Sequence, residues 1–182
     1  MDWGTLVATV SGGSIAISGT VLADYLRNRH EDDRGLGARR RAVYIEFITA
    51  AGVCHARLRQ IAQAPGAEAD LDTASRAALS DAGIYEVRER LFIDATTAVA
   101  SAGQAMFEQL RALQHAVAAG ASLTSSAFHD AYHPYIGTVW AYRLAVRNEL
   151  DGRSLSPEAF GWGEWDGKDR CPMCQGAVAT GV

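Results

Sequence analysis

Hydrophobic positions recur at helical spacing through most of the chain, and no segment alternates apolar and polar residues between turn signals as a strand would. The pattern predicts helices over residues 38–63, 81–118 and 126–150, with a short helix around 73–79. Gly103 is the expected weak point of the second helix, and Pro134 is expected to kink or restart the third. Short connections favour an all-α fold, an antiparallel three- or four-helix bundle over residues 38–152.

Each long helix carries a stripe of positions expected to face the core. The stripe of the first helix comprises Val43, Phe47, Ala50, Cys54, Leu58 and Ile61. The stripe of the second comprises Ile84, Val87, Leu91, Ala95, Ala98, Ala102, Met106, Leu110, Leu113 and Val117. The stripe of the third comprises Phe128, Tyr132, Val139, Val146 and Leu150. These steps of three and four residues indicate helices with one buried face.

Residues 3–23 form an uncharged segment, moderately hydrophobic, that is long enough to cross a bilayer as a helix. Trp3 and Tyr25 stand where interfacial aromatic residues are expected. The segment therefore predicts a single transmembrane helix. Two alternatives remain open, a signal peptide cleaved before Asp24 and a helix buried in the core of a soluble protein.

The residues after this segment predict its orientation. Segment 24–37 is rich in Arg and ends in the expected hinge Gly35-Leu36-Gly37, whereas no Lys or Arg precedes Trp3. The positive-inside rule then places the N-terminus outside and the helical domain in the cytoplasm. Besides setting topology, five basic residues are candidates for contact with the inner leaflet: Arg27, Arg29, Arg39, Arg40 and Arg41.

Small residues recur every four positions in the predicted span. They are Gly4, Ala8, Gly12 and Ala16, followed by Thr20. Such a face lets a second helix approach closely, which makes a homo-oligomer a reasonable expectation. A helix that is merely rich in glycine is the alternative.

Composition excludes several classes of protein. The chain has 182 residues, of which 48% are hydrophobic, so it can bury a core and is unlike a disordered protein. Its net charge of −4 gives no electrostatic reason to expect a nucleic-acid partner. Three cysteines are too few for a secreted disulfide scaffold.

The segment 153–182 differs in composition and is expected to be a non-helical tail whose aromatic residues dock on the bundle. It contains Cys171-Pro172-Met173-Cys174 followed by Gln and Gly. These six residues resemble the metal-binding knuckle of zinc-ribbon and rubredoxin-like sites, which implies zinc as the candidate cofactor. The tail lacks a second cysteine pair, but a second pair from another chain in a dimer, or His115 or Cys54, could complete four ligands. A redox pair, which here lacks its βαβ setting, and an inert pair are the other interpretations.

His129 and His133 lie four residues apart and therefore on one face of a helix. Two imidazoles at this spacing can share a metal, but the glutamate of the H-E-x-x-H motif is missing. The spacing is common, so the sequence alone favours ordinary surface or core histidines.

Three functional hypotheses follow, because no nucleotide-binding, hydrolase, kinase or metalloprotease motif is present. The first is a non-catalytic, membrane-anchored bundle that self-associates or binds a protein partner. The second is a zinc-binding regulatory or enzymatic domain, which requires the two histidines and the tail cysteines to converge in space. The third is a membrane-active effector of a toxin or defence system. The plan of one span before a helical body is similar to that of many small bacterial membrane proteins, and this likeness implies no catalytic residue.

Overall fold

A computed structural model describes residues 35–67, 70–152 and 155–179. All regular structure in these ranges is helical, which confirms the all-α class. A helix covers residues 35–63 and is followed by η1 (Pro65–Ala67), α2 (Leu71–Ser80), α3 (Ile84–Asp94), α4 (Thr97–Ala118) and α5 (Ser126–Leu150). The tail adds η2 (Pro157–Phe160), η3 (Lys168–Arg170) and α6 (Pro172–Ala179).

The chain divides into two compact units, residues 1–41 and residues 42–182. In the first unit the described residues, 35–41, are helical, so Gly35 and Gly37 lie within a helix rather than in the expected hinge. Arg39 and Arg41 are exposed there and Arg40 is half-buried. The other predicted membrane-contact and helix-association residues lie outside the described residues.

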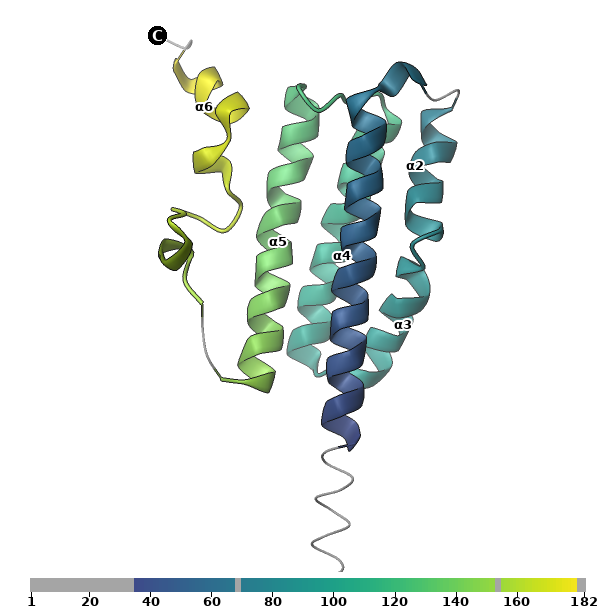
Figure 1. Cartoon of the computed structure of the whole chain (residues 1–182), viewed down its shortest axis with the longest axis vertical. Helices are drawn as coiled ribbons and strands as arrows, with labels where there is room; N and C mark the ends of the chain where they lie inside the picture. The colour runs from purple at the N-terminus through teal and green to yellow at the C-terminus, as the bar shows by residue number, and fades with distance from the viewer. Residues whose placement is uncertain (1–34, 68–69, 153–154, 180–182) are drawn as a thin grey trace, which may run out of the picture. The chain divides into compact units, whose positions relative to one another are not determined.

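The second unit is a helical bundle in which α2 and α3 run in the same direction, one after the other, α4 runs back, and α5 reverses again (Figure 1). α2 and α3 follow each other along one side, and α4 packs more extensively against α5 than against α2 or α3. The predicted stripe of the first helix is buried at every position. Its neighbours Tyr44 and Ala51 are buried as well, which widens the apolar face of this helix to one typical of a bundle core.

The long helix predicted over 81–118 is in fact two helices. Ala95 and Thr96 adopt extended backbone between α3 and α4, and the Thr96 hydroxyl donates a hydrogen bond to Glu149. The break resets the helical phase, so Ala98 is exposed and Val99 takes the buried position in its place. The predicted stripe is correct up to Leu91 and again from Met106 onward.

Gly103 is a site of close packing and not a kink. It lies buried within the uninterrupted α4, where a β-carbon would come 2.4 Å from Leu91 Cδ2 and 3.3 Å from Phe47 Cε1. The absence of a side chain at this position therefore lets α4 approach α3 and the 35–63 helix closely.

Helix α5 begins with a side-chain cap, because Ser125 Oγ accepts a hydrogen bond from the Phe128 N–H. It continues through Pro134 without restarting. Of its predicted stripe, Phe128 and Val139 are buried, whereas Tyr132, Val146 and Leu150 are half-buried.

The prediction of a single-pass membrane protein is contradicted. Within residues 35–67, 70–152 and 155–179, no helix combines the length and apolar character that crossing a bilayer requires. The predicted span, residues 3–23, lies outside the described residues.

The tail was expected to be non-helical, and this expectation is wrong for most of the part that the structure describes. Its two short 3-10 helices and α6 lie alongside α5, on the side away from the other helices of the bundle (Figure 1). Helix α5 is therefore covered on two sides, by α4 and the 35–63 helix on one and by the tail on the other.

Candidate metal centre

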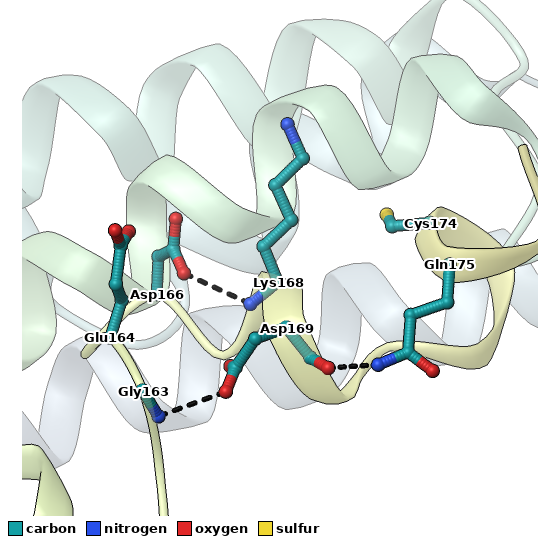
Figure 2. Close-up of a pocket in the computed structure, with 7 residues that line it drawn as sticks. All are labelled: Gly163, Glu164, Asp166, Lys168, Asp169, Cys174 and Gln175. Carbon is teal, nitrogen blue, oxygen red and sulfur yellow. Dashed lines mark hydrogen bonds between the residues drawn. The ribbon is translucent and has the colours of Figure 1, made fainter. Parts of the chain in front are cut away.

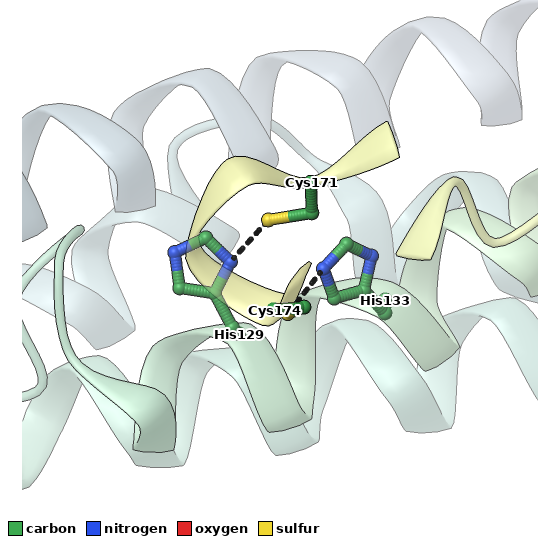
Figure 3. A group of neighbouring side chains, drawn as sticks. All are labelled: His129, His133, Cys171 and Cys174. Carbon is green, nitrogen blue, oxygen red and sulfur yellow. Dashed lines mark hydrogen bonds between the residues drawn. The ribbon is translucent and has the colours of Figure 1, made fainter. Parts of the chain in front are cut away.

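Two pairs of side chains, remote in sequence, meet between α5 and the tail. His129 and His133 project from α5 one turn apart, while Cys171 immediately precedes α6 and Cys174 lies in its first turn. One ligand atom from each of the four residues lies within 4.8 Å of all the others (Figure 3). The convergence that the zinc hypothesis requires is therefore present in a single chain.

Two sulfur–nitrogen distances in the cluster are close to those of a tetrahedral site. Cys171 Sγ lies 3.4 Å from His129 Nδ1, and Cys174 Sγ lies 3.3 Å from His133 Nε2. Around zinc, bonds of about 2.3 Å to sulfur and about 2.0–2.1 Å to nitrogen place neighbouring sulfur and nitrogen ligands about 3.6 Å apart. For these two sulfur–nitrogen pairs, the observed distance therefore differs from that of a tetrahedral zinc site by only a few tenths of an ångström.

Backbone carbonyls fix which nitrogen of each imidazole is free to bind. His129 Nε2 lies 2.9 Å from the carbonyl oxygen of Leu123, and His133 Nδ1 lies 2.9 Å from that of Asp166. A carbonyl can only accept, so in each neutral ring this nitrogen carries the proton. The other nitrogen has a lone pair, and in both rings it faces a cysteine sulfur. Histidine ligands of metals generally donate their second N–H in this way.

The two thiols differ in acidity although they are neighbours. Burial raises the pKa of Cys171, but hydrogen bonds, first among them the one from the backbone N–H of Cys174, outweigh it, so the pKa lies below its ordinary value. The pKa of Cys174 is raised, first by burial and then by the hydrogen bond with Cys171 and its charge. The pair therefore loses its first proton at a lower pH, and its second at a higher pH, than an ordinary thiol does. A divalent cation bound to both sulfurs would offset the cost of removing the second proton.

An aromatic cluster holds the tail against α5 at some distance along the helix from the four candidate ligands. The Trp140 ring stacks on Trp165 with centroids 4.1 Å apart and an interplanar angle of 19°, and it also contacts Phe160 and Trp162. The guanidinium of Arg143 lies 4.6 Å above the Trp140 ring. Docking of the tail aromatic residues agrees with the sequence-based expectation.

A compact turn in the tail positions the cysteines. Asp166 Oδ1 accepts from the Lys168 N–H, Asp169 Oδ2 accepts from the Gly163 N–H, and the Gln175 amide donates to the Asp169 carbonyl (Figure 2). The turn needs Gly167, whose φ of 66° lies in the left-handed region. Since the same turn presents the Asp166 carbonyl to His133, it couples the tail backbone to one candidate ligand.

Other candidate ligands stay apart from this cluster. Cys54 is fully buried in the bundle core, and burial raises the pKa of its thiol to about 12. His115 lies on α4, where its ring is 3.4 Å from Arg111. Completion of the site by Cys54, by His115 or by a second chain is therefore unnecessary.

Sequence reasoning missed three residues that matter here: Trp140, whose position on α5 is outside the predicted stripe, and Leu123 and Asp166, whose backbone carbonyls accept hydrogen bonds from the two histidine rings. A backbone carbonyl has no sequence signature. The Asp166-Gly167 pair was the available signal, because such pairs mark turns.

No protein-family model, curated protein or solved structure matches this chain.

Proposed function

We propose that this chain is a non-catalytic zinc-binding protein in which one Zn²⁺ fastens the tail to α5. The four ligands are Cys171, Cys174, His129 and His133. The observation that carries the proposal is their convergence within 4.8 Å, with both imidazole lone pairs directed at the sulfurs.

The ligand types support zinc in preference to the hard cations. Thiolate and imidazole suit Zn²⁺, whereas Mg²⁺ and Ca²⁺ prefer oxygen ligands. Two thiolates also balance the charge of one divalent ion, which favours a neutral complex at this half-buried position. His133, only 4% exposed, would then be a metal ligand rather than a polar group buried for packing alone.

The number of ligands supports a structural role. Four protein ligands fill a tetrahedral zinc site, whereas catalytic zinc keeps one position for water or substrate. Two ligands come from a bundle helix and two from the tail, so the free energy of metal binding stabilises the docked tail. This arrangement favours a zinc-dependent docking element over an enzyme.

The experiment is metal analysis of the full chain purified under reducing conditions and reconstituted with Zn²⁺. We expect about one zinc per chain, and a visible absorption spectrum of tetrahedral, thiolate-bound Co²⁺ after exchange. Cys171→Ser and His133→Gln should lose the metal, while the matched controls Cys54→Ala and His115→Gln should keep it. A wild-type chain that stays metal-free, or site variants that retain zinc, would contradict the proposal.

A second candidate function is self-association or binding of a protein partner, as the sequence suggested. It is supported by apolar side chains left exposed on the bundle, notably Ile93, 80% exposed, and Ile45, 59% exposed. The two side chains belong to elements joined by an ion pair between Arg90 and Glu46. Sedimentation analysis of the oligomeric state of wild type and Ile93→Lys tests self-association through this surface. A wild-type chain that is monomeric and binds no protein partner argues against this role.

A further inference from the structure

The two cysteines are arranged to react with each other as well as to bind a metal. The backbone N–H of Cys174 donates to the carbonyl of Cys171 at 3.1 Å, which makes them the ends of a single turn. Cα atoms at the ends of such a turn are less than about 7 Å apart, and a disulfide needs about 4.4–6.8 Å. Their sulfurs already lie within 4.8 Å of each other. A disulfide can therefore form without moving the turn apart.

We propose that Cys171 and Cys174 are a modification site for small hydroperoxides, and that their oxidation to a disulfide releases the zinc and the end of the tail. The inference rests on the zinc site proposed above. It adds a chemical class of reactant, the hydroperoxides, and a regulatory consequence for that site.

The chemistry balances with a peroxide as the oxidant. With hydrogen peroxide, one thiolate attacks a peroxide oxygen, the O–O bond breaks, and a sulfenic acid and hydroxide form; an organic hydroperoxide releases its alkoxide in place of this hydroxide. The second thiolate then attacks the sulfenic sulfur, the S–S bond forms, and a second hydroxide leaves. Two electrons pass from the sulfurs to the peroxide, and two protons convert the two hydroxides into water. Both zinc–sulfur bonds break because the sulfurs are no longer thiolates.

The positions of the ligands determine which part of the tail is released after oxidation. After oxidation only His129 and His133 remain, and two imidazoles on one helix do not complete a zinc site. The connection between α6 and α5 then depends on neighbouring contacts, such as the hydrogen bond from His133 to Asp166. The aromatic cluster around Trp140 holds a different part of the tail and is unaffected by the chemistry. We therefore expect the segment around α6 to detach while the cluster stays docked.

The third cysteine provides an internal control. Cys54 has no exposed surface and lies in the bundle core, so a peroxide has no access to it in the folded chain. Cys171 and Cys174 are half-buried, which leaves their sulfurs open to a small oxidant. Oxidation should consequently be confined to one pair.

The experiment begins with the zinc content of the reduced full chain, in wild type and in Cys54→Ala. Hydrogen peroxide is then added in the presence of a chromophoric chelator too weak to strip the reduced protein. Zinc release, disulfide formation by peptide mass spectrometry, and hydrogen exchange around α6 are followed together. We expect one zinc released per Cys171–Cys174 disulfide, faster exchange around α6, and reversal by a thiol reductant with added zinc. Both proteins should behave alike.

The two proposals fail in different ways. A reduced chain without zinc overturns the zinc site, and this inference with it, before any peroxide is added. A zinc-loaded chain that keeps its metal in a large excess of peroxide overturns only the inference. Release of zinc without the Cys171–Cys174 disulfide would also overturn only the inference. The same holds if the disulfide forms while the metal and the protection of α6 from exchange are retained.

Discussion

Replacing Trp140 with alanine should weaken zinc binding although this residue contacts no ligand. Trp140 lies on α5, and its ring is the surface on which Trp165, Phe160 and Trp162 pack. Those contacts hold the tail near α5 before a metal arrives, which keeps the two thiols close to the two imidazoles. Without them, zinc must also supply the free energy of ordering the tail.

The magnitude follows from the pairs that are lost. An aromatic pair contributes about 0.5–1.5 kcal/mol beyond the area that it buries, and Trp140→Ala removes three such pairs. Partial exposure of the cluster and the ring contacts that remain within the tail reduce the sum, so we expect a loss of about 1.5–3 kcal/mol. At about 1.4 kcal/mol per factor of ten, the zinc dissociation constant should rise about ten- to hundred-fold.

The assay is a competition titration of zinc against a chelator of known affinity, on the full chain at fixed pH. Phe92→Ala is the matched control, because Phe92 is also a half-exposed aromatic residue with an arginine guanidinium over its ring, but it lies on α3. Far-ultraviolet circular dichroism should show the bundle intact in both variants. An unchanged dissociation constant in Trp140→Ala would refute the idea that the aromatic cluster preorganises the metal site.

Three further predictions concern the bundle and its cysteines. Gly103→Ala should lower the free energy of unfolding by about 1–3 kcal/mol through overpacking. Gly52→Ala, with nothing within 4 Å of the new β-carbon, should raise it by up to about 1 kcal/mol. Equal stability of the two variants in denaturant titration would contradict the packing argument. Burial lowers the pKa of His55 from 6.5 to about 4, so the unfolded chain takes up the proton first and stability falls as pH drops through that interval. His55→Gln should reduce this loss of stability at low pH, by at most about 3 kcal/mol and by less because the ring is partly exposed. Identical pH profiles of stability for the two proteins would exclude a contribution from His55. Maleimide should modify two thiols in the native metal-free chain and none in the zinc form, with Cys54 reacting only after unfolding; early labelling of Cys54 would contradict its burial.

The helices were predictable because burial of one face of a helix produces a periodic pattern in its own local sequence. The stripe from Val43 to Ile61 follows one face of one helix, and burial of that face repeats in the sequence at the helical period. The break between α3 and α4 was missed because its cause is not local. Thr96 donates to Glu149, more than fifty positions away, and an alanine-rich sequence continues the helical period across the interruption.

The candidate site shows the same limit. Each pair had a visible spacing, since Cys171 and Cys174 fit a metal-binding knuckle and His129 and His133 fit one helix face. The sequence did not show that the pairs meet, because 41 and 42 positions separate the contacting residues. Their meeting depends on where the tail returns along α5. That path is set by ring packing on Trp140 and by the turn at Asp166, neither of which a periodic pattern encodes.

Division of the ligands between a bundle helix and a tail affects how fast the metal can exchange. A zinc ion enclosed by ligands from the bundle core alone could leave only when the core opens, at a rate limited by global unfolding. In the proposed site, two of the four ligands are on a segment none of whose described side chains belongs to that core, so local opening of the tail suffices for exchange. Bound zinc would then exchange with free zinc while the bundle stays folded. The rate of this exchange would be set by the opening of the tail and by dissociation of the ion.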